Sequence, residues 1–360
     1  MQFLKYFFLL LLSFLVLLHP SKSVAGENKK ALTVGAVLSL TGMAALQGSS
    51  IQDGLEFAKS ELAKDGWKID IIYEDDGTEP KRTIAAVESL VHRDIKLIIG
   101  PIWEILATPA SPIIKRANAV SFQPSNSSDF VFGVNDRNFF FLARPSLALE
   151  PLTAALKTKD AKRIAIVNND SSWGQLWKRI FEAAAKDADA KIISTHFFQF
   201  SDGTSGIPSL LSKLKGQKID TILSTGSNDF VSMLVKGAET QKFKLTMIGP
   251  EFLDAQLDGL LPKESQFVEA ESILPKASPE FIEAFTKWKG TAPKKYTDFA
   301  HNTLFTLTKA VDEVGNDPDA IKNYLETKLD ETIFGNRLRL NAAHDVEGVG
   351  YEVTEVIKLK

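Results

Sequence analysis

The sequence contains no cysteine among its 360 residues. This absence excludes disulfide bonds, thiolate nucleophiles and cysteine-ligated metal sites. It also excludes acylation of a mature N-terminal cysteine, so we expect no lipid anchor. Histidine is scarce, and the five histidines, at positions 19, 92, 196, 301 and 344, show no metal-ligand spacing. We therefore expect neither a metal site nor a cofactor.

A basic stripe is also missing. The formal net charge is −3 at pH 7, with 44% hydrophobic and 24% charged residues, which is ordinary for a soluble globular protein. A nucleic-acid partner would require clustered basic residues, so we expect none. The length exceeds the size at which single cores stop growing, which favours two domains.

One long apolar run stands at the start of the chain. The run Phe7 to Leu18 follows Lys5 and precedes Ser23-Val24-Ala25, which is the layout of a cleaved secretory signal peptide. The run is short for a membrane span, although an uncleaved anchor is the alternative. We assign residues 1–25 to the signal peptide and expect a periplasmic mature protein.

The rest of the sequence alternates apolar segments with helical patterns. Strands are expected at 32–40, 69–73, 97–99 and 119–122, and again at 163–167, 191–198, 221–223 and 245–248. This alternation predicts two parallel α/β sheets, one in each half. Helices dominate from residue 278 until strand-like segments at 337–340 and 351–359, so the late helices must pack on an earlier sheet. Pro109 and Pro112 predict an interrupted helix.

Two of the expected strands end in a Gly-Pro pair followed by an acid. The segment 97–99 is followed by Gly100-Pro101, Ile102, Trp103 and Glu104, and the segment 245–248 by Gly249-Pro250 and Glu251. Open α/β sheets bind ligands at the carboxyl ends of their strands, so these side chains are candidate binding groups. The alternative is that both acids are solvated turn residues and that Trp103 and Trp173 belong to the core. The polar loop 123–128 can hold an anion, although solvent turns look the same.

In order and spacing, these segments resemble the type I periplasmic binding proteins, in the branch of leucine, isoleucine and valine receptors that serve ABC importers. The resemblance covers essentially the whole mature chain. It is carried by Leu32 to Gly42, Asp75-Asp76 with Pro80, Leu97 to Pro101, Arg163 to Val167 with Trp173-Gly174, Met247 to Glu251, and the helix around Ala300.

The resemblance implies two Rossmann-like lobes with parallel sheets, joined by three hinge crossings and closing on a ligand in the cleft between them. The implied N-terminal lobe is 26–143 plus 273–334, and the C-terminal lobe is 144–272 plus 335–360. The crossings would then lie near 143–145, 271–273 and 333–336, with Gly335 absorbing part of the rotation.

The resemblance also implies roles for individual residues. Glu251 matches the acid that pairs with a ligand's α-ammonium, and Ser127 matches the hydroxyl that receives its carboxylate. Trp173 falls where an aromatic covers the ligand, and Ser227-Asn228 where aromatics often stand. Glu104 departs from the family by replacing a carboxylate-binding serine, and His301-Asn302 replaces a frequent Tyr-Asp pair. The predicted ligand-binding residues are Gln47, Ile102, Trp103, Glu104, Asn126, Ser127, Trp173, Ser227, Asn228 and Glu251.

The implied function is a monomeric solute receptor that binds without chemistry and delivers its ligand to ABC permease subunits in the membrane. Two acids beside Trp103 and Trp173 favour a ligand with at least one amine. If Glu104 points to solvent, an ordinary aliphatic amino acid is the alternative. An extracytoplasmic sensor on the same fold is the competing class, although a sensor usually continues into a membrane span and none follows Lys360. A transcription regulator is disfavoured because the chain carries an export signal.

Overall fold

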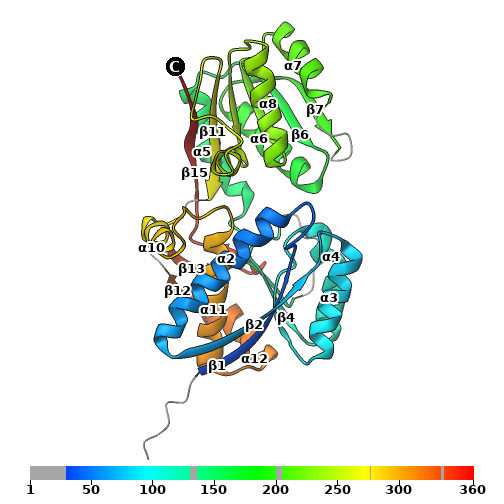
Figure 1. The fold of residues 1–360 in the computed structure, drawn as a ribbon, viewed down its shortest axis with the longest axis vertical. Coiled ribbons are helices and arrows are strands. Elements are labelled where there is room, and N and C mark those ends of the chain that lie inside the picture. Colours follow the sequence, from blue (N-terminus) through cyan, green and yellow to red (C-terminus); the bar gives the residue numbers. More distant parts are fainter. Residues whose placement is uncertain (1–29, 130–135, 200–204, 276, 334–335) are drawn as a thin grey trace, which may run out of the picture.

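The computed structural model describes residues 30–129, 136–199, 205–275, 277–333 and 336–360. They form two α/β lobes that follow one another along the long axis of the molecule (Figure 1). The predicted signal peptide and Gly335 lie outside these residues. Within the described ranges, no helix is both long enough and apolar enough to cross a membrane.

The first lobe is built on a parallel sheet in the order β2-β1-β3-β4-β5. Its strands are β1 (Lys30–Leu38), β2 (Trp67–Asp75), β3 (Leu97–Ile99), β4 (Val120–Gln123) and β5 (Asn138–Phe140). The helices between them are α2 (Ala45–Leu62), which runs on into a 3-10 turn (Ala63–Asp65), α3 (Pro80–His92) and α4 (Glu104–Arg116). The apolar face of each helix covers the sheet, which buries Leu55, Val87 and Ile114.

The late helices return to this first sheet, as the sequence predicts. They are α10 (Pro279–Lys289), α11 (Thr297–Val314) and α12 (Pro318–Lys328). Helix α11 lies directly against α2, and the two backbones approach closely at Gly54. A Cβ atom on Gly54 would lie 2.1 Å from the Thr297 carbonyl oxygen, so only glycine fits this contact.

The second lobe is built on a sheet in the order β10-β15-β11-β9-β8-β6-β7. Its strands are β6 (Arg163–Asn169), β7 (Lys191–Phe198), β8 (Thr221–Thr225), β9 (Leu245–Gly249), β10 (Glu264–Ser265), β11 (Val268–Pro275) and β15 (Tyr351–Leu359). Only the pairing of β11 with β15 is antiparallel. The helices are α5 (Leu149–Thr158), α6 (Ser172–Asp187), α7 (Ile207–Gly216), α8 (Asn228–Thr240) and α9 (Phe252–Leu257), and a 3-10 turn (Pro145–Ala148) precedes α5. The predicted doubled α/β fold is confirmed.

A small third sheet lies beside the first one. It contains β12 (Asp330–Ile333), β13 (Asn336–Leu340) and β14 (Val346–Glu347). The backbones of Asp345 and Phe140 form an isolated parallel β-bridge. The Asp345 carboxylate accepts a hydrogen bond from the Ser128 amide at 2.7 Å. Residues 336–347 therefore pack on the first lobe, although the predicted division assigns them to the second.

The chain passes between the two lobes three times, after β5, after β11 and between β14 and β15. The lobe boundaries remain a proposal. Because β13 and β14 lie beside the first sheet, we propose that the third crossing falls at 348–350 instead of 333–336.

Helix α4 corrects the predicted interruption, because it continues through both prolines. Pro109 and Pro112 lack the amide hydrogens that would bond the carbonyls of Ile105 and Thr108. Both of those residues are exposed, so water can solvate their carbonyls. Burial of the opposite face keeps the helix in place.

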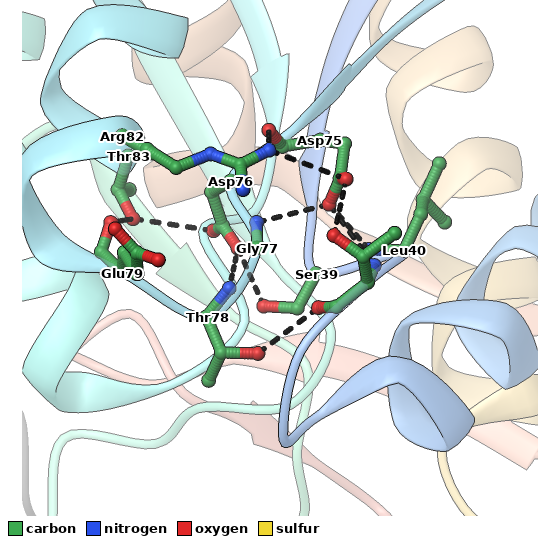
Figure 2. A network of polar contacts seen from close by, with 10 residues as sticks. Ser39, Leu40, Asp75, Asp76, Gly77, Thr78, Glu79, Arg82 and Thr83 are labelled. Atoms are coloured by element: carbon green, nitrogen blue, oxygen red, sulfur yellow. Dashed lines mark hydrogen bonds and ion pairs between the residues drawn. The ribbon is translucent and has the colours of Figure 1, made fainter.

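A polar network joins the loops that follow β1 and β2 (Figure 2). The Asp75 carboxylate accepts hydrogen bonds from the amides of Leu40, Thr41 and Gly77 at 2.9–3.1 Å. The buried Asp76 accepts the Ser39 hydroxyl at 2.6 Å. These carboxylates satisfy loop amides that lead into α2, and they thereby position the start of that helix at the carboxyl edge of the sheet.

Candidate functional site

The acid predicted after the second Gly-Pro stop is buried among polar partners. Glu251 follows β9 and is 5% exposed. Its Oε1 accepts a hydrogen bond from Trp173 Nε1 at 2.9 Å, and its Oε2 accepts a long one from the Gly226 amide at 3.4 Å. Trp173 begins α6 and Gly226 follows β8, so the ends of three neighbouring strands converge on this carboxylate.

A lysine from the segment between α10 and α11 also reaches this carboxylate. Lys295 Nζ lies 3.8 Å from Glu251 Oε1, 5.0 Å from the centre of the Trp173 ring and 5.1 Å from the centre of the Tyr296 ring. Its amide donates to Asp254 Oδ1 at 3.3 Å, and its side chain is only 6% exposed. An acid and two aromatic faces are the surroundings that a bound ammonium group prefers.

Burial and the neighbouring charges shift the pKa values of these groups. Burial raises the pKa of Glu251 to about 7, against the opposing charge of Lys295 and the hydrogen bond from Trp173. Desolvation likewise raises the pKa of Asp254. Burial alone would lower the pKa of Lys295, but Tyr296, Glu251 and Asp254 raise it above its ordinary value. The charged ammonium of Lys295 favours the ionised form of Glu251, while burial favours the neutral form.

In the first lobe, the structure brings Gln47 and Trp103 together. Trp103 Nε1 donates to Gln47 Oε1 at 2.6 Å, which links the turn after β3 to the first turn of α2. Both side chains are half-buried. Ile102 is fully buried, and its carbonyl accepts the hydroxyl of Ser125. Its side chain therefore belongs to the core.

Glu104 is the first residue of α4 and is half-buried. A carboxylate at a helix N-terminus interacts favourably with the helix dipole and the free amides there. The position of Glu104 is therefore explained without a ligand cation. Its role toward a ligand remains a prediction.

The loop after β4 holds two fully buried candidates. Asn126 Nδ2 donates to the Pro101 carbonyl at 3.1 Å and to Gln123 Oε1 at 2.9 Å, which fixes the loop to the turn after β3. Within the described part of the chain, Asn126 Oδ1 and Ser127 Oγ have no hydrogen-bond partner. A buried polar atom without a partner is costly, so both atoms retain capacity for a ligand.

Ser227 and Asn228 have structural roles. Ser227 is exposed and caps α8, with its hydroxyl accepting the Phe230 amide at 3.3 Å. Asn228 Nδ2 donates to Asp258 Oδ2 at 2.6 Å. Asp258 also pairs with Lys294, so this edge is connected to the segment that carries Lys295.

The sequence profile of the family described as "Periplasmic binding protein" matches residues 31–351. The chain belongs to this family. The Leu/Ile/Val-binding protein of Escherichia coli K12 is 24% identical over 343 residues, which is 90% of each chain. The recognition of a type I periplasmic binding protein in the branched-chain amino acid branch is thereby confirmed.

Solved structures share the fold of this binding protein. The branched-chain amino acid transporter substrate binding protein of Streptococcus pneumoniae, in complex with isoleucine, has a TM-score of 0.76 and 18% identity, covering 91% of this chain and 100% of that one. An ABC transporter solute binding protein of R. palustris, in complex with benzoate, has a TM-score of 0.78 and 17% identity, covering 91% and 93%.

Three residues of the candidate site were not predicted, namely Asp254, Lys295 and Tyr296. The sequence offers one signal near them, the pair Lys294-Lys295 just before α11. Lysines in loops are ordinarily solvated, so the pair by itself does not indicate a buried partner. The contact with Glu251 arises only when the late helices return to the first lobe.

Proposed function

We propose that this protein is the solute receptor of an ABC importer, which binds a small organic ligand and delivers it to permease subunits in the membrane. The observation that supports this most directly is the buried carboxylate of Glu251, held by Trp173 where the ends of β6, β8 and β9 converge. Buried polar groups at such a sheet edge are typical of a ligand site. We propose binding without chemistry.

The proposal includes the compartment. Residues 1–25 carry the basic start, short apolar core and small-residue cleavage site of a signal peptide. We propose that the peptide is cleaved and that the mature protein works in the periplasm as a monomer without a lipid anchor.

Two ligand classes deserve comparison. Acids beside aromatic residues favour an amine-bearing ligand, and the pneumococcal relative is in complex with isoleucine. The R. palustris relative is in complex with benzoate, an acid that carries no amine. Both ligands contain a carboxylate, so we propose a carboxylate-bearing ligand received by the buried hydroxyl of Ser127.

A thermal-shift screen over amino acids, amines and carboxylic acids tests the receptor function. A ligand at about one hundred times its Kd stabilises the folded protein by about 2.7 kcal/mol, which raises the melting temperature measurably. Hits are then quantified by titration calorimetry. A screen in which no member of the three classes shifts the melting temperature would contradict the proposal.

The sensor alternative predicts the same ligand binding, so a second measurement is needed to separate the two. Solved structures of similar proteins that are named as transporter binding proteins support the importer over the sensor. Ligand-dependent association with purified permease subunits is the expected result. Association with a signalling protein in place of a permease would favour the sensor.

A further inference from the structure

Lys295 lies beside Glu251, the acid that the family resemblance pairs with the ammonium group of an amino-acid ligand. In the family resemblance, Glu251 pairs with that ammonium. Here the carboxylate already has a cation 3.8 Å away, and the same cation lies against the faces of Trp173 and Tyr296. The set of contacts is the one that recognises a bound ammonium, yet the chain itself supplies the charge.

The segment carrying Lys295 is anchored on the second lobe at more than one point. Its amide donates to Asp254 at 3.3 Å, and the preceding Lys294 forms an ion pair with Asp258. Asp258 is in turn held by Asn228. Because Asp254 in α9 accepts the Lys295 amide and the side chain of the preceding lysine pairs with Asp258 at the end of that helix, the backbone that carries the ammonium is held by contacts besides the Lys295 side chain itself.

We infer that Lys295 takes the place of a ligand's α-ammonium on Glu251, and that the ligand of this receptor is a small carboxylate without an α-ammonium group. The inference rests on the proposed receptor function and specifies its ligand class. A second ammonium at Glu251 would face the charge of Lys295 in a buried site, where like charges repel strongly. Among the described residues the buried Ser127 hydroxyl has no partner, and it remains for the carboxylate.

Matched ligand pairs that differ only in the α-ammonium group test this inference. Leucine is compared with 4-methylpentanoate, and phenylalanine with 3-phenylpropanoate, by titration calorimetry on the full mature protein. We expect the wild type to bind the acid of at least one pair about tenfold or more tightly than the matching amino acid, a difference that calorimetry resolves easily. This measurement needs no variant, so it stands even if a substitution impairs folding.

The variant Lys295→Met removes the charge and keeps a flexible apolar stem. We expect it to lose the preference for the acid and to gain binding of the matching amino acid, because Glu251 is then without its internal cation. The control Lys178→Met changes a lysine of α6 that pairs with Glu182 and contacts neither Glu251 nor the segment that carries Lys295, and it should keep the wild-type preference. Melting curves verify that each variant is folded.

Two outcomes would overturn the inference. If the wild type binds an amino acid as tightly as its partner acid, or more tightly, Lys295 does not exclude a ligand's ammonium group and the inference is wrong. The proposed receptor function is unaffected by that outcome. If no member of either pair binds to the wild type or to Lys295→Met, the inference fails together with the proposed ligand class, and the broader thermal-shift screen then decides whether the receptor function fails as well.

Discussion

At the scale of single residues, the ionisation of Glu251 depends on what folds around it. Burial raises its pKa, while Lys295 and the Trp173 indole oppose the shift. Lys295 in turn keeps its charge because acids and aromatic faces surround it. The two groups are a coupled pair, so removing one leaves the other buried without its counter-charge, a change that is usually strongly destabilising.

The raised pKa of Glu251 predicts a specific dependence of stability on pH. A carboxyl group with a pKa of about 7 in the folded protein and 4.5 ordinarily binds its proton more tightly when folded. Its contribution to stability is therefore present at low pH and is lost as pH rises from about 4.5 towards about 7. Glu251→Gln cannot ionise and should lack this slope. Between about pH 5 and pH 7.5, we expect the free energy of unfolding of the wild type to fall by roughly 2 kcal/mol relative to that of the variant.

Urea unfolding of both proteins at the two pH values measures this difference. Parallel pH profiles of the free energy of unfolding for wild type and Glu251→Gln would show that the carboxyl group titrates normally in the folded protein.

At the scale of elements, the contact among α2, α10 and α11 is aromatic. The Phe57 ring meets the Phe285 ring edge-on at 5.5 Å, and His301 lies 5.2 Å from Phe57 and 4.5 Å from Phe305. His301 is fully buried, so its departure from the family pattern fills a helix interface. Together with the close approach at Gly54, these contacts hold the late helices on the first lobe and thereby position the segment 290–296 that carries Lys295.

His301 should make this interface sensitive to acid. Burial lowers the pKa of His301 to about 3, so the folded protein keeps the ring neutral while the unfolded chain protonates it near its ordinary value of 6.5. Stability is therefore lost as pH falls from about 6.5 towards 3. His301→Phe removes this titration. Between about pH 8 and pH 5 we expect the free energy of unfolding of the wild type to fall by roughly 2 kcal/mol more than that of the variant.

Thermal or urea unfolding at about pH 5 and pH 8 tests the interface, with His92→Phe as the control because His92 is an exposed histidine at the end of α3. If the wild type and His301→Phe lose the same stability between pH 8 and pH 5, a group other than His301 causes the loss.

At the scale of the whole molecule, the chain passes between the two lobes three times, which makes relative motion of the lobes possible. A ligand that contacts both lobes favours the closed arrangement by its differential contacts. We therefore expect small-angle scattering to report a smaller radius of gyration when a ligand from the screen is added at saturation. An unchanged radius at saturation would mean that binding does not close the lobes.

The sequence by itself determined many of the elements and their order, but not the short strands β5, β10, β12 and β14, nor β11. Leu97–Ile99 was predicted because three apolar residues end at Gly100-Pro101, and Tyr351–Leu359 was predicted as a strand-like segment. The Gly-Pro stop also led to Glu251, and the family likeness led to Trp173, and the structure brings these two side chains into hydrogen-bond contact. These signals are local, since apolar periodicity and turn residues act on the backbone within a few positions.

Only the tertiary structure decided which charges meet. Residues 336–347 pack on the first lobe because Asp345 reaches Ser128 and Phe140, contacts that no local pattern encodes. Lys295 lies on Glu251 because the late helices return to the first sheet and carry their connecting segment across to the second. A lysine in a loop has the same local pattern whether it is solvated or buried against an acid. Its partner is set by the packing of distant segments. That packing brings the Lys295 ammonium to Glu251, where the sequence alone predicts the ammonium of a ligand.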